Sequence, residues 1–223
     1  MKRWTGLLLC IIILSAALCG CSSYVALEDR AFVMAIGADW EEGAYRISYA
    51  FPDLATLTGN QKGGYEEPMT FQANDLEASR RKYEALGNRS IDYGQTKVLI
   101  LGQSLLDNEE ALKKLFQEMT KNPQFARTIL LCGTNGKAED IIKLDGEVDG
   151  SVGIYIEQLF RNNGEKLGYE TVILNDVSGI EDKETMQKLD IPMIKIAEKK
   201  PSLNGTFSIF ALAQQRMSLY TVD

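Results

Sequence analysis

A cysteine at position 21 follows a short apolar segment, and its neighbours predict a covalent modification. The sequence Leu18-Cys19-Gly20-Cys21 reads as a bacterial lipobox, with a leucine three positions before the cysteine and a small residue directly before it. A thiol is needed there because diacylglycerol attaches through a thioether, and the amine freed by cleavage can be acylated as well, as with palmitate. We therefore expect Cys21 to be the lipidated first residue of the mature chain.

The residues before Cys21 have the order of a signal peptide. Lys2 and Arg3 give a basic start, and the stretch 7–14 is almost wholly apolar. That stretch is shorter than the roughly 20 apolar residues of a spanning helix, and the arrangement is typical of a secretory signal. We assign residues 1–20 to a lipoprotein signal peptide and expect a membrane attachment through the lipid anchor. The alternative is an ordinary signal or an uncleaved anchor in which the cysteine is incidental.

The composition excludes several kinds of enzyme. The 223 residues include no histidine, so a Ser-His-Asp triad, a Cys-His pair and histidine-bound zinc are all excluded. Cys10 and Cys19 leave with the signal peptide, so only Cys21 and Cys132 remain. Because Cys21 would carry lipid, we expect no disulfide framework. We expect Cys132, at the end of an apolar run, to be buried. A net charge of −7 argues against nucleic acid as a partner, and we predict no cofactor and no enzymatic activity.

Apolar periodicity divides the mature chain into strands and helices. An apolar run at 32–36 and alternation at 45–51, joined by a turn at 39–43, predict an N-terminal hairpin. A helix capped by Asn74 or Asp75 is expected to run to about residue 86, and one capped by Asp107 or Asn108 to end at Pro123. Further helices are expected at 137–144, 152–160 and 181–189, and further strands at 96–101, 125–132, 191–196 and 206–210. The order predicts an α+β or mixed α/β fold, in which alternating helices and strands follow the hairpin and form a mixed sheet with one face partly exposed.

Two residues at the end of the first strand have a structural interpretation. Gly37 can adopt a positive φ at a strand end, and Asp39 can accept hydrogen bonds from backbone N–H groups within the turn. Direct contact of Asp39 with a ligand is the alternative.

Two loops resemble ligand sites in part. Residues 145–152 carry oxygen side chains and a glycine in the order of a calcium loop, but Ile156 stands where the bidentate glutamate belongs. An acidic turn that caps a helix is the preferred interpretation. Gly133 and Gly136 suggest a phosphate loop, but the Lys-Ser/Thr pair that should follow is missing. We therefore predict no metal site and interpret the glycines as a strand turn.

The stretch Leu27–Asp39, shortly after the predicted lipidated cysteine, resembles the Ger(x)C family of spore germinant receptor C subunits. Both have an acidic start, an apolar strand and a Gly-x-Asp ending. Residues 97–102 followed by a helix, and 190–194 followed by 204–207, agree with the family in order and spacing. The resemblance spans most of residues 21–212.

The resemblance implies a non-enzymatic, lipid-anchored subunit of a nutrient germinant receptor. Such a subunit would lie on the outer face of the spore inner membrane, a cell membrane, with an integral membrane A subunit and a transporter-like B subunit as partners. Residues 21–195 would form the family's N-terminal domain and residues 196–223 the start of a truncated second domain. An extracellular solute-binding lipoprotein is the main alternative. A cell-envelope hydrolase is less favoured, because no convincing pair of carboxylates stands out.

Overall fold

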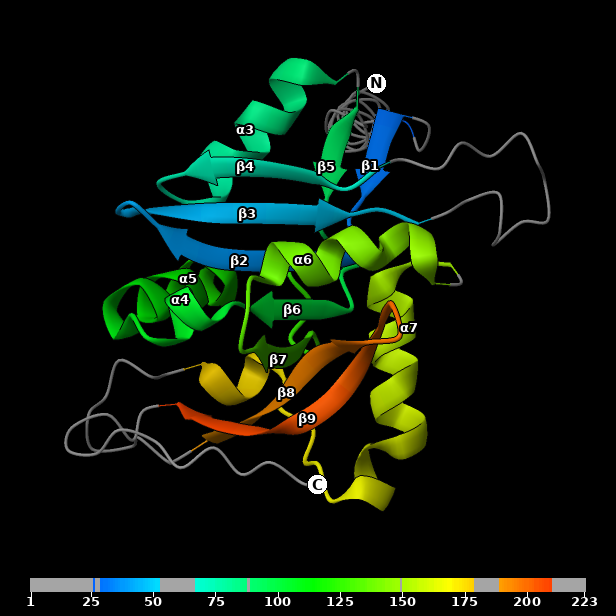
Figure 1. Cartoon of the computed structure of the whole chain (residues 1–223). Helices are drawn as coiled ribbons and strands as arrows, with labels where there is room; N and C mark the ends of the chain where they lie inside the picture. Colours follow the sequence, from blue (N-terminus) through cyan, green and yellow to red (C-terminus); the bar gives the residue numbers. More distant parts are fainter. Residues whose placement is uncertain are drawn as a thin grey trace, which may run out of the picture.

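The computed structural model describes residue 26 and residues 29–52, 67–87, 89–148, 150–178 and 189–209. A seven-stranded mixed sheet crosses these residues in the order β4-β3-β2-β6-β7-β8-β9, and β1 and β5 form a separate parallel pair (Figure 1). The strands are β1 (Arg30–Phe32), β2 (Ala35–Glu41), β3 (Ala44–Ala50), β4 (Met69–Ala73), β5 (Ser90–Asp92), β6 (Val98–Leu101), β7 (Leu130–Thr134), β8 (Leu189–Ala197) and β9 (Lys200–Ile209). The predicted α+β class with a mixed sheet is confirmed.

The N-terminal hairpin forms as predicted, but its turn is tighter. β2 and β3 pair antiparallel from Ala35 opposite Ala50 to Glu41 opposite Ala44. Only Glu42 and Gly43 remain for the turn, and their φ values of 53° and 80° are those of a two-residue turn that matches the strand twist. The prediction of a turn at 39–43 was therefore wrong, because Asp39 lies within β2.

Helices cover both faces of the sheet. One face carries α3 (Leu76–Leu86), α4 (Gln103–Leu106) and α5 (Glu109–Lys121), and the other carries α6 (Ala138–Ile142) and α7 (Val152–Leu159) (Figure 1). Leu99 and Leu101 of β6 point to the first layer, while Val98 and Ile100 point to the second. All four are buried, so the central strands have no exposed face, contrary to the prediction. Half-exposed positions are found in the strands toward the sheet edges, β4, β8 and β9.

Short helical turns complete the second half of the chain. They are the 3-10 helices Lys143–Glu147, Glu165–Leu167 and Leu174–Val177 and the π-helical segment Phe160–Gly164, which continues α7.

The predicted helix starts are confirmed by their capping bonds. The Asp75 carboxylate accepts the N–H of Ala78 at 2.6 Å, and the Asn108 side chain accepts the N–H of Ala111 at 3.0 Å. These bonds satisfy N–H groups that the first turn of a helix leaves without a partner.

The last described strands extend the same sheet. β8 lies parallel to β7, with Met193 opposite Gly133, and β9 returns antiparallel to β8. The strand predicted at 125–132 begins later, at Leu130. Part of the predicted helix 181–189 and part of the segment 196–223 lie outside the described residues, and the domain boundary at residue 196 stays a prediction.

Candidate functional site

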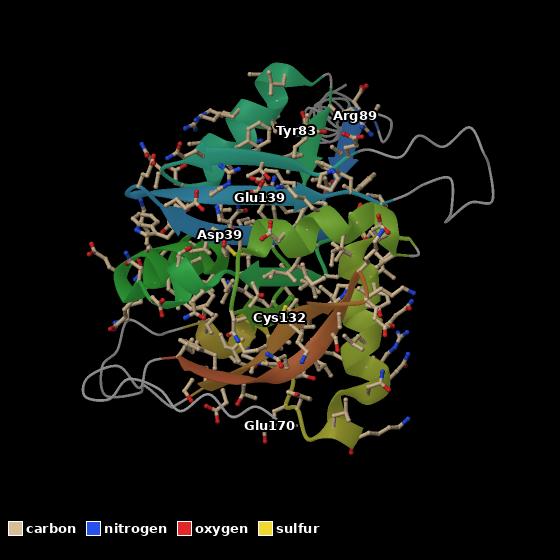
Figure 2. The ribbon with its side chains drawn as sticks, viewed as in Figure 1. Asp39, Tyr83, Arg89, Cys132, Glu139 and Glu170 are labelled. Carbon is tan, nitrogen blue, oxygen red and sulfur yellow. The ribbon has the colours of Figure 1, made fainter. Side chains whose placement is uncertain are left out.

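The residues of the predicted lipidation site lie outside the described residues. They are Leu18, Cys19, Gly20 and Cys21, so lipidation stays a prediction. Cys132 lies in β7 with no exposed surface, and burial raises the pKa of its thiol (Figure 2). It is therefore the small buried hydrophobe that the sequence indicated. Within the described ranges, no helix has both the length and the apolar character to cross a membrane.

Asp39 joins β2 to the first turn of α6. Its Oδ1 accepts the N–H of Ala138 at 2.8 Å and its Oδ2 accepts the N–H of Glu139 at 3.1 Å (Figure 2). The side chain has no exposed surface, so burial raises the pKa of Asp39, while the two N–H bonds oppose that shift. Asp39 does accept backbone N–H groups, but they belong to a helix about 100 residues further along the chain. We call this contact the Asp39 clasp.

Two glycines allow α6 to approach the sheet. A Cβ at Gly37 would lie 2.8 Å from Cγ1 of Ile142, and a Cβ at Gly102 would lie 1.7 Å from Oδ1 of Asp39. Gly37 does not have a positive φ, so that prediction was wrong. The residue instead gives the space that close packing of a helix on a strand requires.

A set of ion pairs surrounds the Asp39 clasp. The Arg46 guanidinium binds the Glu139 carboxylate through two bonds of 2.5 and 3.1 Å, and Lys143 lies 2.9 Å from the same carboxylate. Lys137 pairs with Glu41 at 2.8 Å. The bond from Arg46 is the largest effect that lowers the pKa of Glu139, to about 2. These pairs fix α6 on β2 and β3, and every charged group in them has an opposite partner.

The other two loops have structural roles. Oδ1 of Asp145 accepts the N–H of Val152 at 2.7 Å, directly at the start of α7. This bond fits the capping turn, and among the described residues no three acidic, cysteine or histidine side chains gather as a metal site. Gly133 lies inside β7, where a Cβ would approach Sδ of Met193 to 2.5 Å, so it serves packing rather than a phosphate loop.

A cavity between the start of α3 and the end of α5 was not anticipated from the sequence. Its volume is about 320 Å³, and its lining residues are Asp75, Leu76, Glu77, Tyr93, Glu118, Asn122 and Phe125. Asp75 caps α3, while Glu77 pairs with Arg80 at 2.6 Å. Oε2 of Glu118 accepts the N–H of Leu76 at 3.1 Å, and burial raises the pKa of Glu118. All three carboxylates are thus held by neighbours.

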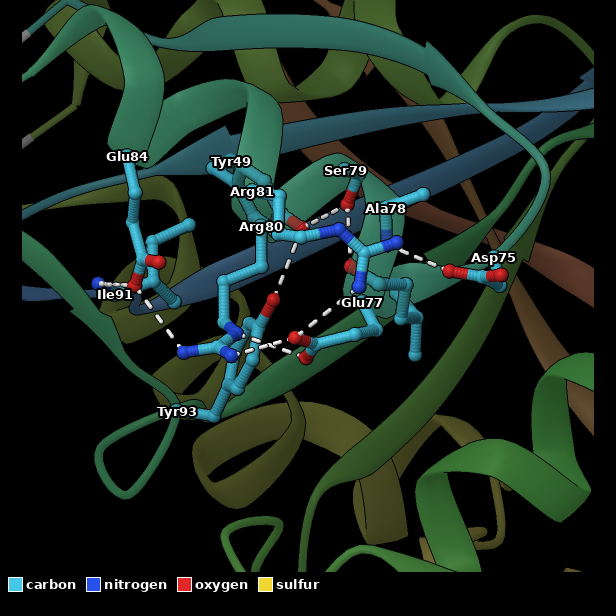
Figure 3. A network of polar contacts seen from close by, with 11 residues as sticks. Tyr49, Asp75, Glu77, Ala78, Ser79, Arg80, Arg81, Glu84, Ile91 and Tyr93 are labelled. Carbon is cyan, nitrogen blue, oxygen red and sulfur yellow. Dashed lines mark hydrogen bonds and ion pairs between the residues drawn. The ribbon is translucent and has the colours of Figure 1, made fainter.

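A network of buried hydroxyl groups lies beside this cavity. The Tyr49 hydroxyl bonds to the hydroxyls of Ser79 and Tyr93, the latter at 3.0 Å (Figure 3). Burial raises the pKa of Tyr49 to about 12, so its phenol stays protonated at neutral pH. The Tyr93 ring stacks on Phe125 with 4.5 Å between centroids. The cavity therefore has an aromatic wall of stacked rings, and the three carboxylates at its rim are already bonded to neighbours.

Comparison with known proteins gives a consistent result. Residues 23–196 match the family model described as "Spore germination protein N-terminal domain". A protein of Bacillus subtilis (strain 168) named "Putative spore germination protein YfkR" is 24% identical over 152 residues, or 64% of this chain. The match covers 37% of that relative, so the chain spans well under two thirds of its length. No solved structure gives a significant match.

Proposed function

Because the chain belongs to the family of spore germination protein N-terminal domains, we propose that it is a lipid-anchored, non-enzymatic subunit of a nutrient germinant receptor. The family match over residues 23–196 is the observation that carries the proposal. A role related to spore germination follows from the family. The lipid anchor, the receptor and its other subunits are the finer parts, and each can be tested separately.

The lipid anchor is supported by where the matched domain begins. Its first residue, at position 23, comes two residues after Cys21. Cleavage before Cys21 would therefore leave the whole matched domain attached directly to lipid. Two or three acyl chains hold a protein firmly, since each buried CH₂ contributes roughly 0.8 kcal/mol. The anchored domain would lie on the outer face of the spore inner membrane.

A non-enzymatic role is supported by the chemistry of the side chains. The sequence has no histidine. In the cavity beside α3, the carboxylates of Glu77 and Glu118 are engaged with Arg80 and a backbone N–H. With these carboxylates of the described cavity engaged, contact with a partner is the action that we propose. Anchoring in the membrane raises its effective concentration toward the integral membrane A and B subunits without any new contact.

Lipid labelling tests the anchor. Cys21→Ala is expected to abolish incorporation of labelled palmitate and to leave uncleaved precursor in the membrane. Cys10→Ala is the matched control, because it removes a thiol of the signal peptide outside the lipobox, and it should be labelled like the wild type. Unchanged labelling of Cys21→Ala would refute the assignment.

Affinity purification from detergent-solubilised spore membranes tests the receptor assignment. Mass spectrometry of the bound proteins is expected to identify the two membrane subunits. Recovery of the protein alone, still bound to membrane, would contradict the receptor assignment and leave the anchor intact.

A further inference from the structure

We propose that the end of the domain where α3 ends and β1 and β5 begin is the face that lies on the membrane, and that it contacts anionic lipid headgroups. The inference rests on the proposed lipid anchor at Cys21. It adds an orientation and a contact surface to that anchor.

The length of chain between the anchor and the fold limits which end can reach the bilayer. Arg30, the first residue of β1, comes nine positions after Cys21 in the chain. At roughly 3.3–3.6 Å per residue, the tether extends at most about 30 Å. A domain of this size is about 40 Å across. Arg30 therefore stays within about 30 Å of the membrane, and the side of the domain opposite Arg30, about 40 Å away, cannot reach it.

The structure shows what lies next to Arg30. β1 and β5 are parallel, with Arg30 opposite Ser90. The starts of both strands therefore lie side by side, and α3 ends at Leu86, only four residues before Ser90. Figure 1 shows α3, β1 and β5 together at one end of the molecule, with β9 toward the other.

The surface of this end has the composition that binds an anionic bilayer. Leu86 is 73% exposed, more than any other large hydrophobic residue in the described part of the chain. Lys82 lies one helical turn before it on the same face, and Arg81 is 62% exposed while pairing with Glu77 at 3.5 Å. An exposed leucine beside cations places apolar atoms at the acyl boundary and positive charge at the headgroups.

The acidic residue of the last turn does not oppose this contact. Oε1 of Glu84 is bonded to Arg80 at 3.2 Å and accepts the N–H of Ile91 at 3.3 Å. The Lys82 ammonium donates to the carbonyl of Gln72, a bond that leaves its charge in place. Two exposed cations, Arg81 and Lys82, thus lie at this end of the domain, and the exposed Asp29 lies directly before β1.

A fluorescent reporter tests the orientation in the full, lipidated protein. The thiol of Cys132 is buried and that of Cys21 would be blocked by lipid, so Leu86→Cys can be labelled at one site with an environment-sensitive fluorophore. Leu167→Cys is the matched control, a leucine 60% exposed beside the cavity next to β9. Both proteins are reconstituted in phosphatidylglycerol–phosphatidylethanolamine vesicles that carry a quencher on the acyl chains.

We expect quenching and a blue shift at position 86, and neither at position 167. Lys82→Gln should lower the ratio of docked to detached domain, read from the quenching at position 86, about fivefold, because one headgroup charge contact is lost. Lys166→Gln should not change this ratio. Equal signals at both positions, or a signal at 167 alone, would overturn the orientation even though the protein floats with the vesicles. Failure to float would refute the lipid anchor, and the orientation would fall with it.

Discussion

Replacing Gly102 by alanine would break the Asp39 clasp without touching Asp39. The new Cβ would lie 1.7 Å from Oδ1 and 2.8 Å from Cγ of Asp39, far inside van der Waals contact. The φ of −71° at Gly102 is open to any residue, so backbone strain is not the cause. The carboxylate must swing away and lose its bonds to the N–H groups of Ala138 and Glu139.

The magnitude follows from those two bonds. A hydrogen bond to a charged group contributes about 1.5–3 kcal/mol, and partial relaxation leaves an expected cost of about 3 kcal/mol for Gly102→Ala. Asp39→Ala loses the same bonds and should cost about as much. In the double variant the methyl group enters the space that the carboxylate left. Adding Gly102→Ala to Asp39→Ala should then lower the free energy of unfolding by less than about 1 kcal/mol more. The coupling energy between the two positions is thus about 2 kcal/mol, within the range for residues in contact.

Urea unfolding of the wild type, both single variants and the double variant measures this coupling. Gly136→Ala is the control, because a Cβ there meets nothing within 4 Å, and it should be near neutral. If the two single losses add within about 0.5 kcal/mol, Gly102 does not act through Asp39 and the reasoning is wrong.

The remaining predictions concern one ion pair and two backbone positions. Arg46 holds the pKa of Glu139 at about 2 against an ordinary 4.5, so the stabilisation is complete above pH 4.5 and is lost as the pH falls toward 2. Glu139→Gln should lower the free energy of unfolding at neutral pH and flatten its acid dependence, as followed by circular dichroism. Gly153→Ala should destabilise by about 2 kcal/mol, because its Cβ would lie 2.3 Å from the carbonyl oxygen of Met34; an unchanged melting temperature would contradict the contact. Lys199 has a φ of 63°, which costs a residue with a side chain more than it costs glycine. Lys199→Gly should therefore raise the melting temperature by the equivalent of about 1 kcal/mol. A melting temperature below that of the wild type would show that the Lys199 side chain stabilises the turn.

Local signals in the sequence predicted the elements well. Each of two helix starts was narrowed to a pair of neighbouring caps, of which the structure selects Asp75 and Asn108, because a capping side chain bonds to an N–H only three residues away. The hairpin of β2 and β3 was found because its strands alternate and lie close in sequence. The apolar run at 98–101 predicted a strand, but whether one or two helical layers cover it depends on where distant helices pack.

The two polar sites depend on contacts between distant segments. Nothing near Asp39 in the sequence indicates that its partners are the N–H groups of Ala138 and Glu139. The cavity between α3 and α5 likewise combines Tyr93 with Glu118 and Phe125, which come from separate elements. The glycine at position 102, directly after a buried strand, was a local sign of this contact. It leaves the space that the Asp39 carboxylate occupies, which becomes evident only when the two residues are seen side by side.

The long separation across the Asp39 clasp also bears on folding kinetics. The bond from Ala138 to Asp39 closes a loop of 99 residues, and contacts of such high sequence separation are slow to form. We expect the clasp to close after the rate-limiting step, so that its loss speeds unfolding and leaves the folding rate nearly unchanged. Where proteolysis outpaces refolding, the lifetime of the domain would then depend on this one carboxylate more than its equilibrium stability suggests.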